Sequence, residues 1–295
     1  MKHREMAGRM MSLAGLVLLA TTTLAALLGM AGPVSTPSMS SAGGGAGADS
    51  SAPGLLHVLG ISGQIRALTL LPGTPKPAAA TAPDGSPLTI LPLVPLSAKL
   101  GATWRGYHVG FWPGERTAGD RARYRLPPGF LEVTPGNENV PLSTHFRVRD
   151  FLTHDQESTW PKVLVIQLPL LDKLELLSAE LVRLGKAPAL HVMSGFRTPQ
   201  YNALGVGPLG GRARDSRHMY GDAADVFLDA DGDGRMDDLN EDGRIDVKDA
   251  RWLAAVADRV EAAHPEVTGG IGIYPANGVH GPFVHVDTRG FRARW

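Results

Sequence analysis

The 295-residue sequence contains no cysteine and has no net charge. The absence of cysteine excludes disulfide frameworks, thiolate zinc fingers, iron–sulfur clusters and cysteine nucleophiles. The 29 basic and 29 acidic side chains cancel, so the chain lacks the basic surplus that nucleic-acid binding or a polybasic membrane surface requires. We therefore expect no nucleic-acid partner, and membrane contact only through an uncleaved N-terminal segment. Nothing in the composition predicts an oligomeric state.

A basic start and a long uncharged run open the chain. Lys2, Arg4 and Arg9 precede 21 uncharged residues, Met10–Met30. This pattern is typical of a secretory signal peptide, and its length also just suffices to span a bilayer. Residues 1–31 are therefore predicted to be a signal peptide or a membrane anchor. Either way the rest of the chain is expected to be exported to the periplasm or cell envelope, and to stay at the inner membrane if the segment is retained.

A linker and a β-rich region come next. Residues 32–54 are almost entirely Gly, Ala, Ser, Pro and Thr, which predicts a flexible linker. Residues 55–141 contain many prolines and short apolar runs, which favour strands over long helices. Alternating aromatic and polar residues over 102–112 predict one strand there. We expect a small β module or a β apron on the following domain, with its aromatic side chains in the core.

The remaining residues, 142–295, combine helical and strand patterns. Leucines recur at helical spacing between Pro169 and Gly185, and residues 250–263 repeat that spacing. Short strands are predicted at 189–193, 223–228, 269–274 and 282–288. This order predicts an α+β fold, in which helices flank a small, largely antiparallel sheet.

Two polar residues interrupt these predicted strands. Asp225 lies inside an apolar run, and His285 has apolar residues on both sides. A buried carboxylate or imidazole is costly unless it is paired, and one metal ion would pair with both. With His218, on the loop before the Asp225 strand, they would leave a zinc ion with an open fourth position, as in catalytic zinc sites. The residues alone also fit hydrogen-bonded structural side chains.

Three motifs carry a family resemblance. Residues 216–225 read S-x-H-x-x-G-x-A-x-D, an H-x-D motif follows at 285–287, and residues 194–197 read S-G-F-R. Together with L-S-T-H-F at 142–146 and D-F at 150–151, these motifs resemble the M15 family of zinc D-Ala-D-Ala carboxypeptidases and endopeptidases. The resemblance covers residues 142–295.

The resemblance implies a function and roles for four residues. Zinc would be held by His218, Asp225 and His285, and Arg197 would face the substrate, stabilising an oxyanion or binding a terminal carboxylate. The protein would hydrolyse peptide bonds in the stem peptides or cross-links of cell-wall peptidoglycan through a metal-activated water. The alternative is a non-catalytic wall-binding or structural protein that keeps the peptidase fold.

The chain departs from the family pattern at the general base. Many relatives place Glu or Asp three residues before the last zinc histidine, or His two before it, whereas this chain has Pro282 and Phe283 there. Asp287 would share a strand face with His285, so we expect it either to deprotonate the water or to orient a ligand histidine. His280, in a glycine-flanked loop, is a second candidate for the base.

An acidic loop is inserted at residues 229–249, with nine acidic and three basic side chains. Part of it has the spacing of an EF-hand loop and resembles the calcium repeat of dockerins. The expected ligands are Asp238, Asn240, Asp242, the backbone carbonyl of Arg244, Asp246 and Asp249. An overlapping stretch offers a second set, Asp229, Asp231, Asp233, Arg235 and Asp237. We expect one or two structural calcium ions; the alternative is a solvated acidic loop.

Overall fold

The computed structural model describes residues 61–69, 78–81, 85, 87–115, 124–207 and 211–295. The predicted signal peptide or anchor and the predicted linker lie outside these residues. By their contacts, the described residues belong to one unit of the chain, except Thr81 and Gly85, which are grouped with another. Among the helices of the described residues, none is long and apolar enough to cross a membrane.

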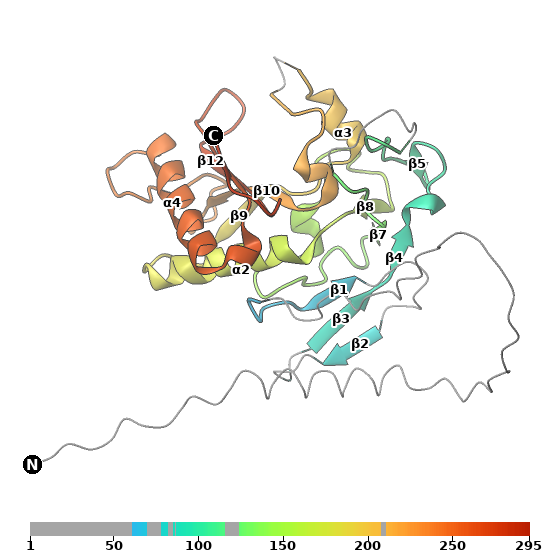
Figure 1. The fold of residues 1–295 in the computed structure, drawn as a ribbon, viewed down its shortest axis with the longest axis horizontal. Helices are drawn as coiled ribbons and strands as arrows, with labels where there is room; N and C mark the ends of the chain where they lie inside the picture. The colour runs from blue at the N-terminus through green and yellow to red at the C-terminus, as the bar shows by residue number, and fades with distance from the viewer. Residues whose placement is uncertain (1–60, 70–77, 82–84, 86, 116–123, 208–210) are drawn as a thin grey trace, which may run out of the picture. The chain divides into compact units, whose positions relative to one another are not determined.

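Short strands dominate the first part of the chain (Figure 1). One sheet of the described residues has the strand order β1 (Ala67–Thr69), β3 (Pro87–Leu91), β2 (Ala78–Thr81). A second sheet has the order β4 (Leu93–Pro95), β7 (Gly129–Val133), β8 (Lys162–Leu164). Strands β5 (Thr103–Trp104) and β6 (Tyr107–His108) form a separate pair. Two 3-10 helices, η1 (Leu96–Ala98) and η2 (Val148–Phe151), accompany them. The described part of residues 55–141 contains strands and a 3-10 helix, as the proline content predicts.

The single strand predicted over residues 102–112 is wrong. The chain reverses between β5 and β6, where Arg105 and Gly106 have φ of 46° and 91°. Two consecutive residues with positive φ make the tight turn that antiparallel hairpins favour. Trp104 and Tyr107 therefore pair across a hairpin instead of alternating along one strand.

A five-stranded sheet forms the second part of the unit (Figure 1). Its order is β13 (Ala293–Arg294), β11 (Gly270–Tyr274), β12 (Phe283–Asp287), β10 (Ala223–Leu228) and β9 (Leu190–Ser194), antiparallel except between β13 and β11. The helices are α2 (Leu168–Arg183), α3 (Pro199–Leu204), α4 (Val247–Ala263), η3 (Arg217–Tyr220) and η4 (Pro265–Val267). The predicted α+β class is confirmed.

Local sequence sets the ends of α2. Pro169 lies in its first turn, where a missing N–H costs nothing. Gly185, with φ 78°, terminates the helix, and the next amide, that of Lys186, donates to the carbonyl of Leu181 at 3.0 Å. This is the Schellman arrangement that satisfies the last carbonyls of a helix.

Helix α4 begins earlier than predicted. Its helical spacing is evident only from Ala250, but the helix starts at Val247. The reason is a capping box. The side chain of Asp246 accepts a hydrogen bond from the backbone amide of Asp249, and the side chain of Asp249 accepts one from the backbone amide of Asp246. The last residues of the predicted acidic loop thus belong to the helix.

The sheet separates a helical face from a polar face. Val284 and Val286 of β12 are fully buried in the core, and α4 packs against β11 and β12. Because side chains alternate along a strand, Phe283, His285 and Asp287 lie on the opposite face. The candidate site residues therefore lie on the face away from α4.

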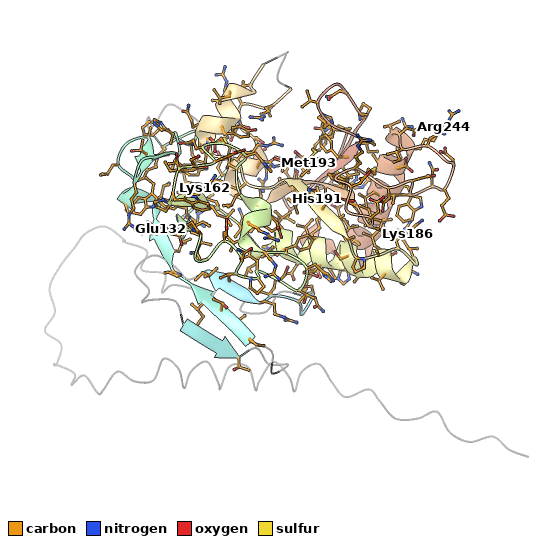
Figure 2. All side chains as sticks on the ribbon, turned by 180° about the vertical axis from the view of Figure 1, so that it is seen from behind. Glu132, Lys162, Lys186, His191, Met193 and Arg244 are labelled. Carbon is orange, nitrogen blue, oxygen red and sulfur yellow. The ribbon has the colours of Figure 1, made fainter. Side chains whose placement is uncertain are left out.

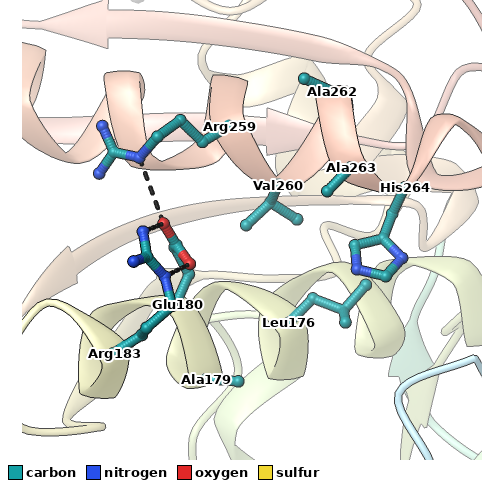
Figure 3. Close-up of a pocket in the computed structure, with 9 residues that line it drawn as sticks. All are labelled: Leu176, Ala179, Glu180, Arg183, Arg259, Val260, Ala262, Ala263 and His264. Carbon is teal, nitrogen blue, oxygen red and sulfur yellow. Dashed lines mark hydrogen bonds and ion pairs between the residues drawn. The ribbon is translucent and has the colours of Figure 1, made fainter.

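A groove of about 620 Å³ lies on the helical side, between α2 and α4 (Figure 3). Leu176 and Val260 contribute to its apolar lining. At one end Glu180 binds Arg183 at 2.7 Å and Arg259 at 3.2 Å. The groove thus belongs to the helical layer and not to the polar face of the sheet.

Candidate metal centre

Three side chains that are distant in the sequence converge on the polar face. His218 lies on η3, and Asp225 of β10 lies directly opposite His285 of β12 in the strand register. The Nε2 atom of His218 is 3.2 Å from both His285 Nδ1 and Asp225 Oδ1. His285 Nδ1 is 2.9 Å from the same carboxylate oxygen. All three side chains are buried.

The spacing of these three atoms suits one shared metal ion. With ligand bonds of about 2.0–2.1 Å and tetrahedral geometry, ligand atoms around zinc lie about 3.3 Å apart. The observed separations of 2.9 and 3.2 Å are close to that value. Two imidazole nitrogens and one carboxylate oxygen are also a donor set that zinc takes. The predicted ligand residues therefore meet in a geometry that could hold a metal ion.

Hydrogen bonds fix which nitrogen of each histidine faces the centre. His218 Nδ1 lies 2.7 Å from the carbonyl of Gly195, so it carries the proton and leaves Nε2 free to bind a metal. His285 Nε2 lies 3.1 Å from Asp287 Oδ2, which leaves Nδ1 for the metal. The two imidazoles thus present different nitrogens, each with a backbone or carboxylate partner behind it.

The S-G-F-R segment supports both His218 and Asp225. A Cβ on Gly195 would lie 2.7 Å from the Cα of Phe151, so only glycine brings this carbonyl to His218. Arg197 donates through Nε to Ser194 Oγ at 2.8 Å and through Nη2 to Asp225 Oδ2. The residue predicted to face the substrate therefore contacts a candidate metal ligand, using two of the five N–H donors of its guanidinium.

Gly221 of the S-x-H-x-x-G motif ends η3. Its φ is 73°, and a Cβ there would overlap the backbone carbonyl of Val165. A larger residue would displace the turn that carries His218.

Asp287 is held in place from several directions. It is fully buried, accepts from the amide of Gly270 at 2.7 Å, and pairs with Arg289, whose Nε lies 2.9 and 3.0 Å from the two carboxylate oxygens. Burial alone would raise the pKa of Asp287, but hydrogen bonds from His285 and Arg289 outweigh it and lower the pKa. Of the two roles expected for Asp287, this contact with the rear nitrogen of His285 matches the orientation of a ligand histidine.

A buried ion pair lies behind Asp287. Lys173 of α2 donates to the Asp287 carbonyl at 2.7 Å and to Glu261 of α4 at 2.5 Å. Glu261 also accepts from the amide of Gly269 at 3.0 Å. Burial lowers the pKa of Lys173, and the charge of Glu261 opposes this effect. The pair ties both long helices to the strand that carries His285.

The protonation states of His218 and Asp225 suit a cation, whereas that of His285 depends on its two carboxylate partners. Burial lowers the pKa of His218, which favours neutral imidazole. Burial would raise the pKa of Asp225, but the charges of His218 and Arg197 and hydrogen bonds from the histidines hold it well below its usual range. Burial likewise opposes a charge on His285, while hydrogen bonds to Asp225 and Asp287 raise its pKa. A metal ion would replace the proton that these groups otherwise share.

The β-rich region contacts this centre through Trp112. Its indole Nε1 donates to the carbonyl of Met219 at 2.6 Å, next to His218, and its ring stacks on Phe196 with centroids 6.5 Å apart. Trp112 is 1% exposed, so its predicted place in the core is correct. Nothing in the sequence signals which segments it joins.

His280 has a different environment. Its Nε2 lies 2.8 Å from Asn277 Nδ2, and its Nδ1 lies 2.8 Å from the carbonyl of Gly281. Both ring nitrogens are thus engaged inside the loop between β11 and β12.

The acidic loop contains two tandem loops of the same structure, residues 229–237 and 238–246. In each, the first aspartate accepts from the fifth and sixth amides, the third side chain accepts from the fifth amide, and the fifth aspartate accepts from the seventh amide. The sixth residues, Gly234 and Gly243, have φ of 79° and 80°. The repeated spacing in the sequence therefore corresponds to a repeated backbone conformation.

The two loops differ in how their charge is balanced. In the first, Asp229, Asp231 and Asp233 bring ligand oxygens within 4.8 Å of one another, and no salt bridge joins them to a described lysine or arginine. Burial and the charge of Asp231 raise the pKa of Asp237 beside them, against a hydrogen bond from a backbone amide.

The second loop has partners of its own. Lys248 lies 2.6 Å from Asp242, and the fully buried Asp249 accepts from three backbone amides, those of Leu239, Asn240 and Asp246. Glu241, beside these residues, binds Lys186 at 2.7 Å, on the side of the molecule where Figure 2 labels Lys186 and Arg244. The second loop is therefore the more neutralised of the two.

Comparisons of the chain with protein-family models, with curated proteins and with solved structures find no match.

Proposed function

We propose that the protein is a zinc-dependent peptidase that hydrolyses peptide bonds of peptidoglycan stem peptides or cross-links. The observation that carries the proposal is the meeting of His218, Asp225 and His285, with each ligand held by a second contact. A protein that kept only the fold would have no use for three converging ligand atoms with prearranged tautomers.

The residues present would divide the work as follows. Zinc bound by the triad would supply Lewis acidity and an activated water. Gly195 and Asp287 hold the imidazole rings at the angles and in the tautomers that binding requires. Arg197 holds the outer oxygen of Asp225, and its remaining N–H donors are available to a developing oxyanion or a substrate carboxylate.

The substrate class and the location depend on the sequence motifs. Resemblance to the M15 family supports cell-wall peptides, and the N-terminal pattern supports export to the compartment that contains them. We propose in addition that the tandem loops at 229–246 bind calcium as a structural ion. Their repeated conformation and the shared negative charge of Asp229, Asp231 and Asp233 support this assignment.

Two measurements on the purified protein test the proposal. Metal analysis should give one zinc per chain, and mass spectrometry of a peptidoglycan digest should show new peptide ends. His218→Ala and His285→Ala should each abolish both results. The matched control is His191→Ala, because His191 is exposed on β9 of the same sheet, where it stacks on Phe227 (Figure 2).

The alternative function gives a different outcome. A non-catalytic wall-binding protein would sediment with peptidoglycan and leave its peptides intact, with or without zinc. Stoichiometric zinc in His285→Ala would show that the ligand assignment is wrong.

A further inference from the structure

An aromatic cluster adjoins the candidate metal centre on its β11 side. Tyr274 and Phe283 are cross-strand neighbours whose rings stack at 4.6 Å with an interplanar angle of 4°. The indole of Trp295 donates from Nε1 to the Tyr274 hydroxyl at 2.7 Å. Its ring lies 5.2 Å from that of His285. We call Trp295, Tyr274 and Phe283 the aromatic shelf.

The sheet makes room for this indole. Gly272 lies opposite His285 in the strand register, so Gly270, Gly272 and Tyr274 share the polar face with the candidate ligands. Cβ atoms on Gly270 and Gly272 would lie 2.9 and 2.5 Å from atoms of the Trp295 ring. Two missing side chains therefore allow the ring to lie flat on β11 beside the metal centre.

The indole is held firmly and yet remains accessible. The backbone of Trp295 accepts a hydrogen bond from Ile273 at 2.9 Å, and Arg289 stacks on the ring at 5.2 Å. Despite these contacts, 49% of Trp295 is exposed. The outward part of the ring is therefore accessible to a ligand.

The chemistry of the shelf selects the ligand. The indole N–H is already bound to Tyr274, so the exposed part of Trp295 offers carbon atoms only. The positive charge of the Arg289 guanidinium is paired with the carboxylate of Asp287, so the net charge beside the shelf is close to zero. An uncharged, apolar side chain gains most from covering such a surface.

We propose that the aromatic shelf binds an apolar, uncharged side chain of the substrate residue next to the scissile bond. The distance of 5.2 Å between the rings of His285 and Trp295 is shorter than the span of two extended residues, about 7 Å. A side chain on the shelf thus belongs to the residue adjacent to the bond held at the metal. This inference rests on the proposed function and adds a specificity determinant to it.

The test compares two chelating probes of the same shape on the zinc-loaded full chain. N-acetyl-leucine hydroxamate and N-acetyl-asparagine hydroxamate bind zinc through the same group and differ in the polarity of the side chain. Calorimetry should show that the leucine probe binds the wild type about tenfold more tightly, because its side chain covers the shelf. Trp295→Ala should bring the ratio close to one while zinc content is unchanged.

Two further variants make the result decisive. Trp295→Phe keeps a smaller ring and should retain part of the preference, which covers the case in which the alanine variant does not fold. Phe291→Ala removes a 61% exposed aromatic residue outside the shelf and should keep the full preference. Equal binding of the two probes by the wild type, or an undiminished ratio in Trp295→Phe and Trp295→Ala, overturns the shelf. A wild type without zinc overturns the proposed function first, and metal analysis distinguishes the two failures.

Discussion

The three candidate metal ligands, here called the triad, and the acidic loop achieve their geometry in opposite ways. His218, Asp225 and His285 come from a 3-10 helix and two strands, are buried, and depend on partners far along the chain. The tandem loops at 229–246 are mostly exposed, and their repeated hydrogen bonds join residues two to five positions apart.

This difference determines how each region should respond to change. The fold itself arranges the triad, because Gly195, Asp287 and Arg197 hold its side chains in place. The acidic loop concentrates negative charge within one segment and gains most from an ion that neutralises it. Loss of a triad residue should therefore affect zinc and not calcium, and loss of a loop residue should affect calcium and not zinc.

The largest expected effect is that of Asp225→Asn. The variant keeps the shape of the side chain but removes the charge that pairs with Arg197 and would bind zinc. Zinc affinity should fall by more than about 100-fold, because loss of a ligand costs more than loss of a residue that only orients a ligand. Competition with a chromogenic chelator measures this. Asp233→Ala, in the acidic loop, is the control. Weakened zinc binding in this variant would show that the two regions are not independent.

Removal of calcium should lower stability without removing zinc. Calcium at 100 times its dissociation constant would stabilise the folded chain by about 2.7 kcal/mol. Thermal unfolding of the zinc-loaded protein in millimolar calcium and in a calcium-selective chelator measures the difference. Asp229→Ala and Asp238→Ala assign it to the first or the second loop. No heat of calcium binding and no change in melting temperature would falsify the site.

Asp287→Asn should separate orientation of a ligand from proton transfer. If Asp287 orients His285, zinc affinity should fall by about 10- to 100-fold, and turnover at saturating zinc should largely recover. If it is the general base, zinc affinity should stay the same while turnover stays low at every zinc concentration. The contacts at the rear nitrogen of His285 favour the first outcome.

Trp112→Phe should show whether the β-rich region supports the metal centre. The variant keeps an aromatic ring on Phe196 but loses the hydrogen bond to the Met219 carbonyl. We expect a loss of about 1 kcal/mol in the free energy of unfolding and weaker zinc binding. Trp160→Phe provides a control outside this contact. Unchanged zinc affinity in Trp112→Phe would make the region independent of the centre.

The smallest effect is expected at the ion pairs beside the α2–α4 groove. Hydrogen bonds from Arg183, with a further one from Arg259, lower the pKa of Glu180 to about 2 (Figure 3). Because the folded-state pKa is lowered, the pair stabilises the protein above pH 4.5 and loses this contribution as the pH falls towards 2. Glu180→Gln should cost about 0.5 kcal/mol at neutral pH and less in acid, with both metal regions unaffected.

Local signals in the sequence predicted much of the fold. The run at 223–228 predicted β10 with its observed bounds, and Pro169 and Gly185 bracket α2 as expected. The prediction was wrong where short-range conformation overrode periodicity. A turn at Arg105 and Gly106 divides the strand expected over 102–112, and a capping box starts α4 before its apolar spacing begins.

The sequence by itself determined the repeated acidic spacing within residues 229–249 and the residues that could bind a metal ion, because residue type and short motifs carry both. Only the tertiary structure decided that Asp225 lies opposite His285, that the two histidines present different nitrogens, and that Arg197 contacts Asp225. It also placed Trp112 against Met219, which is 107 residues away in the sequence, and Trp295 against His285, which is 10 residues away. Strand register and long-range packing set these contacts, and neither depends on any one stretch of sequence.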